Sequence, residues 1–294
     1  MKEKVFAANE VVFREGDLGE CFYDIVSGTA GVYLSYGEPD QNKLTELKAG
    51  QFIGEMAVID SWPRSATVVA EEELKLIEVY ESDLNAYFEE NPDRILALMK
   101  QIGSRIRTLT TEYDEVKEFL REKQEAQEKP GFLSRLRKYQ DLNARAKKLT
   151  KGSGEMEIKL LEFDRPENSP LTMLTFNRGK VIVRQGDGGS FMYAIHSGEV
   201  GIYTNYGTEK QQKLTTLYPG SFFGEMSLLD EEPRSATAIA EMDGTVLEII
   251  RPEDLKELFR VNPIEIDMIL QHLSRRLRML TKDYEKACEE AASV

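Results

Sequence analysis

The chain has 294 residues, of which 41% are hydrophobic and 31% charged, a composition typical of globular proteins with room for two domains. Its formal net charge of −14 argues against a general nucleic-acid binder, because duplex DNA repels so acidic a surface. Its two cysteines, Cys21 and Cys288, form neither a disulfide framework nor a metal-binding pattern, and they suit a reducing cytoplasm.

Short apolar runs separated by turn residues dominate the start of the chain. Runs bounded by Gly, Asp, Asn and Ser cover Phe22–Val26, Ala30–Tyr36, Lys43–Leu47, Ala66–Ala70 and Leu74–Tyr80. Many short strands with regular turns predict a small β-barrel or jelly roll. Helical periodicity follows: Ser82-Asp83 begins one short helix, and Asn91-Pro92 begins another with proline in its first turn.

The helix after Asn91-Pro92 carries apolar residues at alternating spacings of three and four. They are Met99, Ile102, Ile106, Leu109, Tyr113, Val116 and Leu120. This seam of about three heptads is typical of helices that pair. We expect its early positions to cover the strands and its later positions to meet another helix, from this chain or from a second one.

A basic segment joins the two halves of the chain. The helical period up to Lys129 is broken by Pro130-Gly131, and seven basic residues then lie between Arg135 and Lys151 among apolar residues at helical spacing. Such a segment can lie on a membrane, dock on an acidic partner, or dock on the acidic domains of its own chain, and the last is the preferred interpretation. Lys151-Gly152-Ser153-Gly154 predicts a flexible link.

The second half repeats the first at an offset of 170 residues, which becomes 171 near Asp83 and Asp254. Its last helix repeats the seam with Leu270, Leu273, Leu277, Leu280, Tyr284, Ala287 and Ala291. The prediction is a tandem duplication of a mostly β domain that ends in a long helix. The first domain would occupy residues 1–129, the join 130–170 and the second domain 171–294.

One stretch, Phe52–Thr67 and again Phe222–Thr237, carries the clearest chemistry. Both copies contain Gly-Glu-Met and, further on, Pro-Arg-Ser-Ala-Thr. Glycine lets a backbone approach a ligand, and the next residues predict a helical turn whose free N–H groups suit an anion. The arginine nine residues after the glutamate can pair with that anion, and the glutamate can accept sugar hydroxyls. The combination predicts a nucleotide site.

This stretch resembles the phosphate-binding cassette of cyclic nucleotide-binding domains, found in the catabolite activator protein, regulatory subunits of cAMP-dependent protein kinase and cyclic nucleotide-gated channels. The resemblance implies a β-roll followed by helices in each copy. It also implies that Glu55 and Glu225 hold the ribose 2′-hydroxyl, and that Arg64 and Arg234 hold the cyclic phosphate. The residues that it places around the ligands are Gly54, Glu55, Met56, Ala57, Arg64, Ser65, Ala66, Gly224, Glu225, Met226, Ser227, Arg234, Ser235 and Ala236.

Three further positions bear on the ligand. In the family, Ser or Thr at the place of Ser65 and Ser235 can contact guanine, but bacterial cAMP binders also carry Ser, so cAMP is preferred and cGMP is expected to bind as well. Tyr113 and Tyr284 can stack on a base as lids, although both also fit the helical seam, which is the preferred interpretation. Trp62 lies in the first cassette, where its emission should report ligand binding.

We therefore predict a cytoplasmic receptor without enzymatic activity. It would bind two cyclic mononucleotides and signal to an effector protein by moving its helices. We expect no metal, no nucleic-acid contact and no membrane contact, since the sequence shows no metal-ligand spacing, signal peptide or apolar run near the ~18 residues of a membrane span. A homodimer through the long helices is one option.

Other functions stay open at this point. A structural adaptor with vestigial sites and a transcription regulator acting through the basic join are the alternatives. The sequence shows no P-loop, no kinase motif set, and no helix-turn-helix after either long helix. Only four residues precede Val5, without a pseudosubstrate arginine cluster, so the resemblance to the kinase regulatory subunit supports its architecture and not kinase inhibition.

Overall fold

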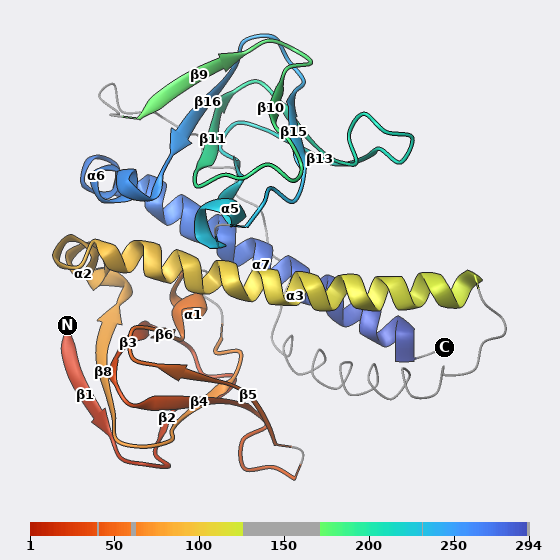
Figure 1. The fold of residues 1–294 in the computed structure, drawn as a ribbon. Helices are drawn as coiled ribbons and strands as arrows, with labels where there is room; N and C mark the ends of the chain where they lie inside the picture. The colour runs from red at the N-terminus through yellow and green to blue at the C-terminus, as the bar shows by residue number, and fades with distance from the viewer. Residues whose placement is uncertain (40, 60–62, 126–170, 231, 293–294) are drawn as a thin grey trace. The chain divides into compact units, whose positions relative to one another are not determined.

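The computed structural model describes residues 1–39, 41–59, 63–125, 171–230 and 232–292 (Figure 1). It contains two β-rolls, each followed by a short and a long helix, so the predicted fold class is confirmed. The first roll consists of β1 (Lys2–Phe6), β2 (Val11–Phe13), β3 (Cys21–Ser27), β4 (Thr29–Leu34), β5 (Asn42–Lys48), β6 (Phe52–Ile53), α1 (Glu55–Ile59), β7 (Thr67–Ala70) and β8 (Leu74–Tyr80). The second consists of β9 (Thr172–Phe176), β10 (Val181–Val183), β11 (Met192–Ser197), β12 (Val200–Thr204), β13 (Gln212–Leu217), β14 (Phe222–Phe223), α5 (Glu225–Asp230), β15 (Thr237–Ala240) and β16 (Thr245–Ile250).

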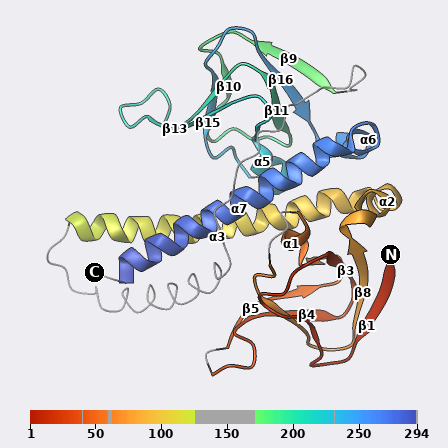
Figure 2. The ribbon, with the colours of Figure 1, turned by 180° about the vertical axis from the view of Figure 1, so that it is seen from behind.

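Each roll is built from two four-stranded antiparallel sheets. The strand orders in the first roll are β1-β8-β3-β6 and β2-β7-β4-β5, and Figure 2 shows β1 beside β8 from behind. In the second roll the corresponding orders are β9-β16-β11-β14 and β10-β15-β12-β13. Equivalent strands therefore have equivalent neighbours, as a duplicated domain requires.

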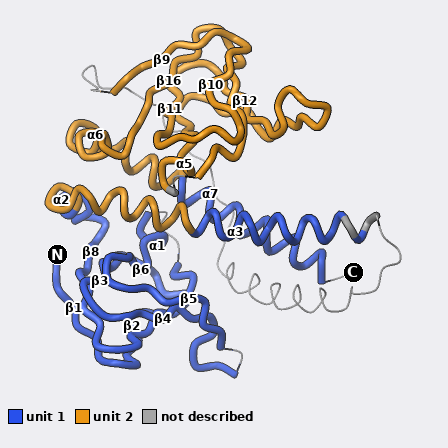
Figure 3. The backbone as a smooth tube through the Cα atoms, in the orientation of Figure 1, with its two compact units in different colours: residues 1–87, 105–155, 273–294 blue, residues 88–104, 156–272 orange. Residues whose placement is uncertain are grey.

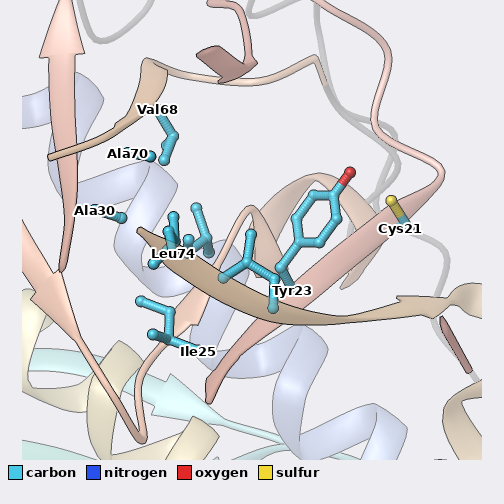
Figure 4. Packing of buried hydrophobic residues seen from close by; sticks show 9 residues of the cluster. Cys21, Tyr23, Ile25, Ala30, Val68, Ala70 and Leu74 are labelled. Atoms are coloured by element: carbon cyan, nitrogen blue, oxygen red, sulfur yellow. The ribbon is translucent and has the colours of Figure 1, made fainter. Parts of the chain in front are cut away.

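The core of the first roll lies between its two sheets. Ile25 of β3 and Leu76 of β8 come from one sheet, and Ala30 of β4 and Val68 of β7 come from the other. Figure 4 shows Ile25, Ala30 and Leu74 close to one another. Each large apolar side chain buried in this way contributes roughly 1.5–3 kcal/mol to folding. The second roll repeats the arrangement with Tyr193, Ile195, Val200, Ala238, Leu247 and Ile249.

Three strands of the first roll were not predicted from the sequence. β1 is mostly exposed and highly charged, and it is ordered by backbone pairing with β8 at an edge of the sheet. β2 has three residues and β6 only two. Such strands lack the length and the alternation on which sequence-based prediction depends.

Both rolls continue into helices through a turn of 3₁₀-helix. Residues Glu81–Asp83 lead into α2 (Leu84–Glu90) and α3 (Asp93–Glu125), and Pro252–Asp254 lead into α6 (Leu255–Val261) and α7 (Pro263–Ala292). The predicted helix starts at Ser82-Asp83 and Asn91-Pro92 agree with these bounds.

The long helices are divided between two compact units (Figure 3). Unit 1 comprises Met1–Tyr87, Arg105–Glu155 and Leu273–Val294, and unit 2 comprises Phe88–Ser104 and Met156–His272. Each unit thus holds one β-roll together with parts of both α3 and α7. The predicted join at 130–170 and the predicted boundaries beside it fall almost wholly outside the described residues, so that division of the chain stays a prediction.

In unit 1 the later parts of the two seams are partly buried, with Tyr113, Leu120 and Leu280 at intermediate exposure. The seam residues Val116 of α3 and Tyr284, Ala287 and Ala291 of α7 are at most 6% exposed. Burial is the main cause of the raised pKa of Tyr113 on α3, and the negative charge of Asp283 on α7 raises this pKa further. The later halves of α3 and α7 therefore lie close together within this unit, so the chain supplies the partner helix itself.

In unit 2 the early part of α3 contacts the second copy. A Cβ added to Gly103 of α3 would lie 2.6 Å from Leu229 Cδ1 of α5. Phe88 at the end of α2 packs edge-on against Phe259 of α6, with ring centroids 5.8 Å apart. The seam spacing did not predict these contacts, since it identifies an apolar face and not the surface that covers it.

Candidate functional site

Each cassette begins with a glycine whose conformation only glycine adopts easily. Gly54 has φ +74° and Gly224 has φ +76°, and each stands between a two-residue strand and a short helix. A Cβ on Gly54 would lie 2.2 Å from Arg64 Nη1, and one on Gly224 would lie 2.3 Å from Arg234 Nη1. Both the backbone angle and the nearby guanidinium therefore require glycine.

The cassette glutamates are buried. Glu55 begins α1 and is 3% exposed, and Glu225 begins α5 and is 2% exposed. The carboxylate of Glu55 accepts a hydrogen bond from Arg105 of α3, with 2.7 Å between Nη1 and Oε1. Burying a carboxylate is costly unless polar groups compensate for the lost water, so such positions are candidates for ligand binding.

The cassette arginines are held by the same backbone groups in both copies. Arg64 donates from Nη1 to the Gly54 carbonyl at 2.6 Å and from Nη2 to the Cys21 carbonyl at 2.5 Å. Arg234 donates from Nη1 to the Gly224 carbonyl at 2.6 Å and from Nη2 to the Phe191 carbonyl at 2.8 Å. The guanidinium groups are thus fixed in matching orientations.

One donor of each guanidinium is left over. The Nε atoms of Arg64 and Arg234 are buried, and among the described residues no group accepts a hydrogen bond from either of them. The two side chains are only 6% and 4% exposed, and burial lowers the pKa of both guanidinium groups. A buried cation with an unused N–H is a site that an oxyanion would satisfy in charge and in hydrogen bonding.

The loop that carries each arginine is fastened to an earlier turn of the roll. Arg64 N donates to the Asp17 carbonyl at 2.8 Å, and Gly16 N donates to the Arg64 carbonyl at 2.9 Å. Thr67 Oγ1, from the end of the motif, accepts a hydrogen bond from Glu15 N at 3.0 Å. The second copy repeats all three bonds with Arg234, Asp187, Gly186, Thr237 and Gln185. The conformation of the arginine loop therefore depends on tertiary pairing.

The remaining predicted site residues are distributed around these groups. Ser65 and Ser235 are exposed, and are therefore accessible to a ligand. Ala57, Ala66, Met226 and Ser227 are buried, whereas Met56 and Ala236 are partly exposed. Trp62 lies outside the described residues, so its proposed reporter role stays a prediction.

The two candidate lids lie in the helical part of unit 1. Tyr284 is 2% exposed, and it belongs to unit 1 although Glu225 and Arg234 of its own copy belong to unit 2. Tyr113 is partly buried, and Lys117 Nζ lies 4.1 Å from the centroid of its ring. The helical seam accounts for both positions, and a role in covering a base stays a prediction.

Three further residues, Gly19, Gly189 and Arg105, lie at the candidate site without having been predicted from the sequence. Gly19 and Gly189 lie against the arginines, since a Cβ on either would be 2.7 Å from the guanidinium carbon. Their equivalence in the repeat was a signal that could have identified them. Arg105 matches Arg276 in the repeat, but that equivalence did not identify Glu55 as its partner, because the pairing depends on tertiary contact.

Within the described part of the chain, no group of three or more His, Cys, Asp or Glu residues could hold a metal ion. No helix described here has both the length and the apolar composition that crossing a membrane requires.

Comparison with known proteins identifies the two rolls. The profile of the cyclic nucleotide-binding domain matches residues 3–91 and 173–262. The chain is 27% identical over 286 residues to the cAMP-dependent protein kinase regulatory subunit of Blastocladiella emersonii, an alignment that covers 97% of this chain and 56% of that protein. It is 40% identical over 118 residues to the cyclic AMP receptor protein of Thermus thermophilus, covering 38% of this chain and 54% of that protein.

Among solved structures, the catabolite activator protein of Thermus thermophilus is 38% identical, with a TM-score of 0.33, over 37% of this chain and 51% of that one. The chain spans little more than half the length of the two curated relatives just described.

Proposed function

Because the chain belongs to the cyclic nucleotide-binding domain family, we propose that it is a receptor that binds one cyclic mononucleotide in each of its two cassettes. One observation carries the proposal. Both copies hold a buried arginine by two carbonyls and leave its Nε–H unused, next to the glycine and the buried glutamate that open the cassette. A cyclic phosphate supplies the missing charge and acceptor, and a ribose supplies hydroxyls for the carboxylate.

The roles divide between two kinds of residue. Arg64 and Arg234 bind the phosphate, and Glu55 and Glu225 accept the ribose 2′-hydroxyl. The remaining contacts are assigned to Gly54, Met56, Ala57, Ser65, Ala66, Gly224, Met226, Ser227, Ser235 and Ala236. The preferred ligand is cAMP, in line with the relatives named for that nucleotide, and cGMP is a weaker second ligand.

The receptor acts by regulation and not by catalysis. Ligand binding shifts the equilibrium between two arrangements of the helices, and an effector protein in the cytoplasm reads the change. The regulatory subunit to which the chain is similar suggests a protein kinase as effector, although the chain spans only 56% of that protein. The proposed functional domains are residues 1–129 and 171–294, with the join at 130–170 between them. Because Val116, Tyr284, Ala287 and Ala291 are already buried within unit 1, the proposal does not include a homodimer through the long helices.

Isothermal titration of the whole chain with cAMP, cGMP and a cyclic dinucleotide tests this function. We expect two cyclic mononucleotides per chain and no binding of the dinucleotide. The exposed Arg178, which lies outside both cassettes, offers a matched control, because Arg178→Ala should keep two sites. No binding of either mononucleotide would refute the proposal and favour a structural adaptor with vestigial sites.

A further inference from the structure

A phenyl ring lies over the guanidinium of each cassette arginine. In the first copy, Arg64 Cζ is 4.3 Å from the ring centroid of Phe13, which is the last residue of β2. In the second copy, Arg234 Cζ is 5.0 Å from the ring centroid of Phe191, which directly precedes β11. The two rings therefore come from different parts of the roll.

The rings do not occupy equivalent positions in the repeat. At the offset of 170 residues, Phe13 matches Val183 and Phe191 matches Cys21. Each copy thus has one phenylalanine and one smaller residue at this pair of positions, in opposite order. The carbonyl at position 21 or 191 still accepts the Nη2 hydrogen bond in both copies, whatever side chain the residue carries. The two copies therefore share the hydrogen bonds that hold the arginine, but the phenyl ring over the guanidinium comes from a different position in each copy.

The ring has a physical task at this place. Two Nη atoms of the guanidinium donate hydrogen bonds to carbonyl oxygens. These two bonds do not prevent the guanidinium plane from tilting, so the direction of its Nε–H depends on what packs against the faces of that plane. The electron-rich face of a phenyl ring attracts a cation, and the attraction is stronger where water is excluded than at an exposed site. Arg64 is 6% exposed and Arg234 is 4% exposed, and both rings are partly buried, so water screens this attraction less than at a fully exposed site.

We propose that Phe13 and Phe191 are positioning residues for the phosphate-binding arginines, and that ligand affinity depends on an aromatic face over the guanidinium, regardless of which strand region supplies it. The inference rests on the proposed function for its effect on affinity. It differs from simple filling of the core, because an aliphatic side chain of similar bulk would fill the space without attracting the cation.

Exchanging the residues between the copies tests the inference. All first-site variants are made in an Arg234→Ala background, so that only the first site is titrated with cAMP. Phe13→Val introduces the residue of the second copy and should weaken binding by about tenfold. Adding Cys21→Phe to Phe13→Val recreates the second copy's arrangement and should restore the affinity to within about threefold. Adding Cys21→Leu to Phe13→Val is the matched control and should not restore it.

A second measurement does not need a ligand. The ring current of Phe13 should displace the NMR signal of the Arg64 Nε–H group, which is assigned by its loss in Arg64→Lys. Phe13→Val should move this signal towards the position typical of arginines without an aromatic cover. The added Cys21→Phe should displace it again, whereas the added Cys21→Leu should not.

These outcomes separate the two proposals. If the unmutated chain binds no cyclic nucleotide, the proposed function fails, and the NMR series alone supports or refutes the positioning role. If cAMP binds but Phe13→Val leaves its affinity unchanged, or Cys21→Leu restores it as well as Cys21→Phe, the positioning role is refuted while the proposed function stands. If the chemical shift of the Arg64 Nε–H group changes neither in Phe13→Val nor after Cys21→Phe is added, the positioning role is refuted in either case.

Discussion

Replacing Arg64 by alanine removes the charge at the centre of the first cassette. The side chain is 6% exposed and donates to the carbonyls of Gly54 and Cys21. The stretch Phe52–Thr67 contains no other arginine in its sequence. The carboxylate of Glu55, which we propose binds the ribose, pairs with Arg105, and the substitution does not touch that ion pair. The substitution should therefore remove the proposed phosphate contact and leave the proposed ribose contact in place.

The size of the effect follows from the burial of the arginine. Breaking a buried ion pair by removing one partner costs roughly 3–5 kcal/mol, because the remaining charge stays desolvated without compensation. At about 1.4 kcal/mol for each factor of ten, first-site affinity should fall by two to three and a half orders of magnitude. Arg64→Lys keeps the charge but loses the forked geometry, so its affinity should lie between those of the unmutated chain and Arg64→Ala.

Calorimetric titration with cAMP provides the assay. The unmutated chain should bind two equivalents, and Arg64→Ala and Arg234→Ala should each bind one in the accessible concentration range. The double variant should bind none, and circular dichroism should confirm that each variant keeps its fold. Two remaining sites in Arg64→Ala, each weakened less than tenfold, would show that the phosphate does not depend on this arginine.

Four further outcomes are expected. Arg234→Ala should change first-site affinity by the equivalent of about 1–3 kcal/mol if the copies are coupled, and an unchanged first-site isotherm would show that they are independent. Tyr87→Phe removes a buried hydrogen bond to Asp24 and should lower the free energy of unfolding in urea by about 1–3 kcal/mol, whereas an unchanged midpoint would assign that bond no net stability. Burial raises the pKa of Cys288 from 9.0 to about 11, so its thiol should resist a disulfide reagent at pH 8 in the folded chain. The free energy of unfolding should decline as the pH rises from 9 to 11, because the unfolded chain loses this proton first. Rapid reaction of the Cys288 thiol in the folded protein would contradict this expectation. Binding at the first site should change the fluorescence of Trp62, and constant emission during saturation measured by calorimetry would disprove that response.

The duplication could be predicted, and the main residues of the candidate site proposed, because both depend on local pattern. The repeat of Gly16-Asp17 and of the cassette marks two equivalent domains, and glycine, glutamate and arginine have chemical properties that do not depend on the rest of the fold. The strands with alternating or continuous apolar residues were found for the same reason. The edge strand β1 was missed because its order comes from its backbone pairing with β8.

The details of the site could not be predicted because they join residues far apart in the chain. The Arg64 guanidinium donates to the Cys21 carbonyl, which is 43 positions away, and any residue type could supply that carbonyl. Arg105 meets Glu55 across 50 positions and carries no motif. The repeat did not reveal that Phe13 and Phe191 share a role, because at the offset of 170 residues each of them matches a smaller residue in the other copy.

Two copies of the cassette, the side chains that carry its charge, and a helix with an apolar seam at the end of each domain follow from the sequence alone. The partners of these groups depend on how the chain packs. The tertiary structure divided α3 between two compact units at Ser104 and Arg105, and it placed an aromatic ring from a different strand region over each arginine. The physical reason is that periodicity and residue chemistry specify which surface must be buried or paired, whereas the identity of the partner depends on packing among many distant residues at once.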